Sequence, residues 1–128
     1  MSALLIWMNT HEAKLFHVGP NSINMEKVEF HGPEHHAESL GRNHTKDQGD
    51  EQKFFRQLTE KLKSVDSGKW LLMGPGLGPV HFKGFLESHH KNLDQKIIGV
   101  EKVDKMPDSE ILSVGRKYLQ RYYLFHSA

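Results

Sequence analysis

The chain has 128 residues, and its 17 basic and 16 acidic side chains leave a formal net charge of only +1. This length suits one domain with one core, and the balanced charge gives no sign of a strongly basic nucleic-acid binder. The absence of cysteine excludes disulfides, thiolate catalysis and cysteine-bound zinc. No stretch approaches the roughly 20 apolar residues of a membrane span, and no signal peptide is recognisable. We therefore expect a soluble cytoplasmic protein whose single domain covers residues 1–128.

The N-terminal part predicts three strands in a meander. Residues 3–8 form a short, continuous apolar run that is typical of a buried strand. Residues 13–18 form a second strand, closed by Gly-Pro-Asn. A third segment, residues 23–30, alternates imperfectly because Met25 and Val28 are out of phase, which indicates an edge strand.

A long polar stretch, residues 31–49, interrupts this pattern. It holds three glycines, one proline and four histidines, and loops of this length are usually functional or disordered. The histidines are irregularly spaced, and Gly32-Pro33 argues against a helix that presents His31 and His35 together. A solvated loop is therefore the preferred interpretation, and we expect neither a metal nor another cofactor.

The C-terminal half alternates helix and strand. Asp50 can cap a first helix, which ends at Ser67-Gly68. A strand over residues 69–73 precedes a helix that begins near Pro79, and a strand over residues 96–103 precedes a last helix. The order β-β-β-α-β-α-β-α predicts an α/β, ribonuclease H-like three-layer fold. It has a five-stranded mixed sheet with helices on both faces.

Glycines and prolines are concentrated in the stretch WLLMGPGLGPVHF, between the fourth strand and the second helix. A Rossmann fingerprint would need a glycine where this chain has Pro79, and a P-loop would need a lysine that is missing. A structural turn explains the glycines, because they tolerate a tight bend, but the helix N-terminus behind them could also contact an anion. The residues concerned are Gly74, Pro75, Gly76 and Gly78.

The sequence offers little support for hydrolytic chemistry. Two-metal nuclease catalysis on this fold needs a carboxylate on the first strand, but residues 3–8 contain none and Glu12 lies beyond them. No Gly-x-Ser-x-Gly elbow is present. We therefore expect a binding protein rather than an enzyme, with no catalytic residues.

The last helix suggests that the protein binds RNA. Its outer face is basic, and Tyr122, Tyr123 and Phe125 nearby could stack a base, although such a face can also simply be solvated. Protonating the four loop histidines near about pH 6.5 would change the charge of residues 31–50 from −2 to +2, so we hypothesise stronger RNA binding at low pH. The candidate RNA-binding residues are His31, His35, His36, Arg42, His44, Lys46, Arg116, Lys117 and Arg121.

Three stretches together resemble the middle domain of the archaeo-eukaryotic peptide-chain release factor and Pelota family. ALLIWMNTHEAKLFHV is similar to its opening hairpin, and LLMGPGLGPVHFKGFL to its Gly-Pro-Gly segment between a strand and a helix. The third stretch, IIGVEKVDKMPDSEILSVGRKYL, resembles the following strand and helix in a bacterial branch described as translational machinery or host-attachment proteins. The resemblance implies the ribonuclease H-like fold and a role in translation.

The chain also departs from that family. Its release factors carry a Gly-Gly-Gln tripeptide in the long loop, whereas this loop holds Gly41-Arg42-Asn43 and Gln48-Gly49, and Pro79 replaces a common lysine. The resemblance therefore implies an accessory protein that binds the ribosome, rRNA or tRNA, without peptide release and with no membrane partner. The alternatives are a hydrolase of peptidyl-tRNA or nucleic acid that uses the histidine-rich loop, and a protein-interaction module without RNA. A homo-oligomer is compatible with each of them.

Overall fold

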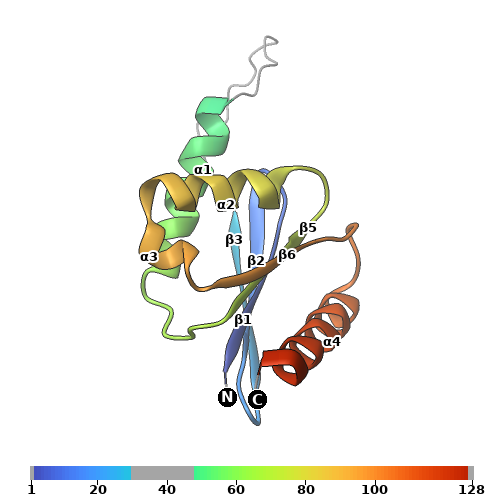
Figure 1. The fold of residues 1–128 in the computed structure, drawn as a ribbon. Helices are drawn as coiled ribbons and strands as arrows, with labels where there is room; N and C mark the ends of the chain where they lie inside the picture. Colours follow the sequence, from blue (N-terminus) through green and yellow to red (C-terminus); the bar gives the residue numbers. More distant parts are fainter. Residues whose placement is uncertain (1, 30–47, 127–128) are drawn as a thin grey trace.

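The protein is described by a computed structural model over residues 2–29 and 48–126. Five strands form one mixed sheet in the order β3-β2-β1-β5-β6 (Figure 1). The central strand β1 pairs antiparallel with β2 and parallel with β5, β3 extends the antiparallel side, and β6 extends the parallel side. The strands are β1 (Ala3–Met8), β2 (Glu12–Val18), β3 (Ile23–Glu29), β5 (Trp70–Gly74) and β6 (Ile97–Lys102).

Helices cover both faces of this sheet, as predicted (Figure 1). On one face, α1 and α2 pack over β1 through a core that includes Leu4, Phe54 and Phe82. On the other face, Leu5 and its neighbours pack against α4. Because both faces are covered, β1 is apolar at every position rather than alternating. The helices are α1 (Gln48–Leu62), α2 (Gly78–His89), α3 (Lys91–Asp94) and α4 (Asp108–His126).

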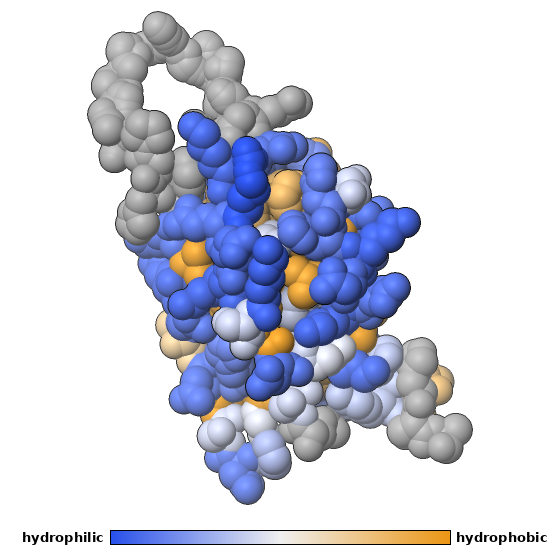
Figure 2. Space-filling model, turned by 90° about the vertical axis from the view of Figure 1, so that its left-hand side faces the viewer, coloured by the Kyte–Doolittle hydropathy of each residue, from blue (hydrophilic) through white to orange (hydrophobic). Residues whose placement is uncertain are grey.

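The third strand is the edge strand that its irregular pattern predicted. Only Val28 of β3 is buried, while Ile23 and Met25 are exposed. The side of the molecule that carries α3 is mainly hydrophilic, and its hydrophobic areas are small and separated from one another (Figure 2). None of the described helices is long and apolar enough to cross a membrane.

Both ends of α1 differ from the sequence prediction, because the helix also ends at Leu62 rather than at Ser67-Gly68. Helix α1 begins at Gln48, so it includes Asp50, the expected cap, and the last two residues of the expected loop. Residue type sets only a capping preference, so an aspartate that could cap a helix can also lie inside its first turn. The single turn α3 was not expected, because one buried residue, Leu93, creates no recognisable period.

Helix α1 is fastened to the antiparallel side of the sheet by an ion pair. The Lys61 Nζ lies 2.8 Å from the Glu26 carboxylate, and His17 Nε2 lies 3.0 Å from the same group. The hydrogen bond from Lys61, reinforced by His17, holds the pKa of Glu26 below its ordinary value of 4.5. A lowered pKa means that this contribution to stability is present above pH 4.5 and disappears as the pH falls through the folded-state pKa.

We expect Lys61→Met to lower the free energy of unfolding by at most about 1 kcal/mol at pH 7, because both partners are substantially exposed. The difference from the native protein should shrink below pH 4.5, as Glu26 becomes protonated. Urea unfolding at pH 7 and pH 3 measures this. Lys53→Met is the matched control, since Lys53 is also exposed on α1 and forms no ion pair with the described residues. A Lys61→Met effect that is equal at both pH values would contradict the ion-pair explanation.

Candidate nucleic-acid interface

Helix α4 is positioned by its first turn and by one close approach to the sheet. The Ile111 amide donates a hydrogen bond to the Pro107 carbonyl at 3.1 Å, and Lys14 of β2 pairs with Asp108 at 2.8 Å. The acidic first turn also suits the positive end of the helix dipole. Along the buried stripe, Gly115 lies so close to the Leu5 side chain that a β-carbon there would overlap it.

The outer face of α4 is exposed and basic, and part of it forms a groove. Two of the predicted RNA-binding residues, Arg116 and Lys117, line this groove beside Ile23 of β3. Its volume is about 460 Å³, and the described residues that line it include no acidic side chain. We call it the cationic groove; its remaining lining residues are Ser109, Leu112, Ser113 and Gln120.

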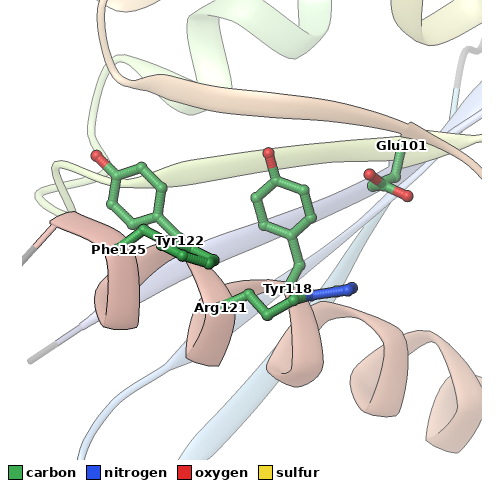
Figure 3. Close-up of a pocket in the computed structure, with 5 residues that line it drawn as sticks. All are labelled: Glu101, Tyr118, Arg121, Tyr122 and Phe125. Atoms are coloured by element: carbon green, nitrogen blue, oxygen red, sulfur yellow. The ribbon is translucent and has the colours of Figure 1, made fainter.

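Arg121, the third predicted residue on α4, belongs to a different site. It lines a pocket of about 300 Å³ between α4 and β6 (Figure 3). We call this the aromatic pocket; its other lining residues are Glu101, Tyr118, Tyr122 and Phe125. The Tyr118 hydroxyl donates a hydrogen bond to the Ile98 carbonyl at 3.3 Å. Lys69 lies over the Tyr122 ring at 5.7 Å, so Tyr122 already has a cationic neighbour.

Sequence reasoning missed several residues of these two sites. Tyr118 was not among the aromatic residues expected to stack a base, but it is half-buried and lines the aromatic pocket. Glu101 was read only as part of a strand. One signal was present in the sequence, because Gly99 breaks the run of apolar residues in this strand. In the structure, a β-carbon at Gly99 would overlap the Tyr118 ring and hydroxyl. A glycine at an edge strand can mark the close approach of another element.

The remaining candidates for RNA binding lie outside the described residues. They are His31, His35, His36, Arg42, His44 and Lys46. The pH-dependent binding hypothesis for this loop therefore remains a prediction. Across residues 2–29 and 48–126, no group of three or more histidine, aspartate or glutamate side chains could hold a metal ion.

The Gly-Pro-Gly corner connects β5 to α2, and both of its glycines have a positive φ. The φ of Gly74 is 154° and that of Gly76 is 61°. A β-carbon on Gly74 would overlap the Met8 carbonyl oxygen, and one on Gly78 would lie 3.1 Å from the Asn9 carbonyl carbon. The turn thus lets β5 and α2 approach the end of β1 closely.

An acidic side chain lies near the N-terminus of α2. Glu51 of α1 contacts His81, in the first turn of α2, at 3.1 Å. A carboxylate here already complements the positive end of the helix dipole, and it would repel a bound anion. The close approach of Gly74 and Gly78, with the positive φ of Gly76, accounts for the three glycines without a ligand. Anion contact at Gly74, Pro75, Gly76 and Gly78 remains a prediction.

Comparisons with known proteins give structural neighbours only: no family model and no curated protein matches the sequence. Pelota from Archaeoglobus fulgidus superposes with a TM-score of 0.64 at 14% identity, over 91% of this chain and 31% of that one. The archaeal translation termination factor aRF1 superposes with a TM-score of 0.59 at 11% identity, over 96% of this chain and 40% of that one. S. cerevisiae Dom34 is described as a translation termination-like factor involved in RNA quality control pathways. It superposes with a TM-score of 0.54 at 13% identity, over 97% of this chain and 39% of that one.

These neighbours confirm the predicted α/β fold and its similarity to part of Pelota and of a termination factor. The chain spans less than half of the length of each neighbour, and at such low identity the similarity concerns the fold alone. Membership of a bacterial branch stays a prediction.

Proposed function

We propose that the protein binds RNA as an accessory of translation, at the ribosome or on tRNA, and that α4 provides the contact surface. The observation that carries this proposal is the cationic groove, where Arg116 and Lys117 lie together without an acidic neighbour in the lining. The setting in translation is supported by the fold, since its structural neighbours include a translation termination factor.

The groove has the chemistry of a phosphate-binding surface. Arginine and lysine supply positive charge, and serine and glutamine side chains are common hydrogen-bond donors to phosphate oxygens. The Ser109 and Ser113 side chains lie one helical turn apart on α4, beside the two cations. A net charge of only +1 is compatible with RNA binding, because affinity for the RNA backbone depends on the cations that contact its phosphates rather than on the charge of the whole chain.

Co-sedimentation with ribosomes tests the proposal. The double variant Arg116→Gln/Lys117→Gln should bind ribosomes or tRNA roughly 10-fold or more weakly at about 0.1 M salt. It should also lower the slope of log K against log salt by about two, one for each lost phosphate contact. Fluorescence anisotropy with labelled tRNA measures both quantities.

The matched control is Lys53→Gln/Lys91→Gln, which removes the same charge from exposed positions on α1 and α3. It should bind nearly as well as the native protein. An equal loss in both double variants would mean that only net charge matters, and absence of any ribosome or tRNA binding by the native protein would overturn the function itself.

A protein-interaction module is the second candidate, and exposed apolar residues at the end of α4 favour it. Leu124 is 75% exposed and Phe125 is 76% exposed. Exposed large apolar side chains that lie together often mark contact with another protein. If this function is correct, the native protein should not bind tRNA or co-sediment with ribosomes, and Arg116→Gln/Lys117→Gln should change neither result.

A further inference from the structure

We propose that the aromatic pocket between α4 and β6 binds an unpaired guanine base. This inference rests on the proposed RNA-binding function and specifies what the α4 surface recognises. The pocket volume of about 300 Å³ is at the small end of the range for ligand sites, which suits one base rather than a larger ligand.

Flat aromatic rings line the pocket, and the Tyr118 ring among them is held in a defined position. Tyr118 is fixed at its hydroxyl by the Ile98 carbonyl and lies against Gly99, where any side chain would displace it. The ring of Tyr122 rises from α4 one turn later (Figure 3). Phe125 completes the lining and is largely exposed. Such rings stack on unpaired bases of every kind, so they provide affinity but not selectivity.

Two opposite charges in the same pocket provide the selectivity. The Glu101 carboxylate and the Arg121 guanidinium lie on the same side of the Tyr118 ring (Figure 3). Within the described part of the chain, neither forms a hydrogen bond or an ion pair with a protein group. A carboxylate on a surface that binds only phosphates would weaken binding by repulsion. Glu101 is accounted for if it accepts hydrogen bonds from the N–H groups of a base.

Guanine fits this pair of charges best. Its Watson–Crick edge presents two adjacent donors, N1–H and the N2 amino group, which one carboxylate can accept together. Its O6 and N7 acceptors match the donors of an arginine. Adenine and cytosine each place an acceptor beside their single amino group, and uracil places its one N–H between two carbonyl oxygens. None of these three presents two adjacent donors to Glu101.

The aromatic pocket and the cationic groove lie on opposite flanks of α4, one beside β6 and the other beside β3. Gln120 lines the groove, and its sequence neighbour Arg121 lines the pocket. Both sites therefore flank the exposed side of α4. One RNA strand that crosses this helix can place phosphates in the groove and an unpaired base in the pocket.

Nucleoside monophosphates test the pocket apart from the RNA backbone. Guanosine and inosine monophosphate carry the same phosphate and differ only in the 2-amino group, which inosine lacks. In NMR titrations of the native protein, guanosine monophosphate should shift the amide resonances of Gly99, Glu101 and Tyr118. It should bind roughly 5-fold or more tightly than inosine monophosphate, since one of two hydrogen bonds to the carboxylate is lost.

Glu101→Gln should reduce this preference to within about 2-fold, because glutamine replaces one of the two acceptor oxygens by an NH2 group, which is a donor and faces a donor of the base. Glu110→Gln is the matched control, with the same change of charge at an exposed position of α4 outside the pocket. It should keep the full preference for guanosine. Circular dichroism of both variants checks that the fold is retained.

A second measurement separates this inference from the proposed function. Labelled oligouridine with one central guanosine should bind the native protein several-fold more tightly than the same RNA with inosine. Equal binding of both RNAs, with the salt effect of Arg116→Gln/Lys117→Gln intact, would overturn the guanine pocket and leave the RNA-binding function standing.

Other outcomes are equally decisive. A guanosine preference that is the same in native protein and Glu101→Gln would overturn the role of Glu101, and with it the inference. Binding of monophosphates without base preference would do the same and would favour recognition of the phosphate or non-selective stacking on the rings. Selective guanosine monophosphate binding without RNA or ribosome binding would support the pocket and overturn the proposed function.

Discussion

Replacing Gly74 by alanine should destabilise the protein by about 3 kcal/mol or more, whereas Gly76→Ala should cost only about 1–2 kcal/mol. Both glycines have a positive φ, which disfavours any β-carbon. At Gly76 the surrounding space is empty within 4 Å, so the backbone conformation is the whole cost. At Gly74 the new β-carbon would also overlap the Met8 carbonyl oxygen and lie 3.0 Å from Pro79 Cγ.

The backbone around Gly74 has little freedom to relieve this overlap. The Gly74 carbonyl accepts a hydrogen bond from the Val103 amide at 3.0 Å, and its neighbour Met73 is paired with Trp7 of β1. Moving the strand away would therefore break contacts on both sides of it. The expected result is a large loss of stability with no ligand present.

Urea unfolding of three alanine variants measures the effect. Gly84→Ala is the control, because Gly84 lies inside α2 with no atom within 4 Å of a β-carbon, and alanine there should stabilise the helix by about 0.5–1 kcal/mol. The three substitutions should thus give a large loss, a small loss and a gain. Similar losses for Gly74→Ala and Gly76→Ala would show that the contact with β1 is unimportant.

Local patterns were enough to predict the elements of the fold, except for the single turn α3. The unbroken apolar run of β1 predicted a strand covered on both faces, and the irregular β3 predicted an edge. Pro79 correctly marked the first turn of α2, because proline suits that position. The predicted start of α1 was wrong, since a residue type that favours the N-cap can also occur inside a helix.

The candidate site was only partly predictable, because it depends on tertiary packing. The exposure of Arg116, Lys117 and Arg121 followed from the helical period of α4. Their division between two sites did not, because Ile23 of β3 borders one site and Glu101 of β6 borders the other. The spacing of apolar residues along the sequence does not show that residues 23 and 101, on two different strands, lie beside α4. That arrangement follows from where α4 crosses the sheet.

Gly115 of α4 and Leu5 of β1 form one close contact between this helix and the sheet. Leu5 is fully buried in the centre of β1, and Gly115 lies over it. Leu5→Ala should cost about 2–5 kcal/mol through lost burial and a cavity. Gly115→Ala alone should cost about 1–2 kcal/mol, because overlap with the Leu5 side chain outweighs the better helix propensity of alanine.

The effects of the two substitutions on the free energy of unfolding should not be additive. In the Leu5→Ala background the overlapping atoms are gone, so Gly115→Ala should gain about 1 kcal/mol from helix propensity instead of losing stability. This reversal of sign corresponds to a coupling energy of about 2–3 kcal/mol, which urea unfolding of the four proteins in the cycle measures.

Gly84→Ala in the same two backgrounds is the control, and its gain should be unchanged, since α2 lies on the other face of the sheet. A Gly115→Ala loss that persists in the Leu5→Ala background would mean that another contact holds α4. The link to function is direct: Gly115→Ala changes no lining residue of the groove or the pocket. If it weakens RNA binding while the protein stays folded, the position of α4 on the sheet is what assembles both sites.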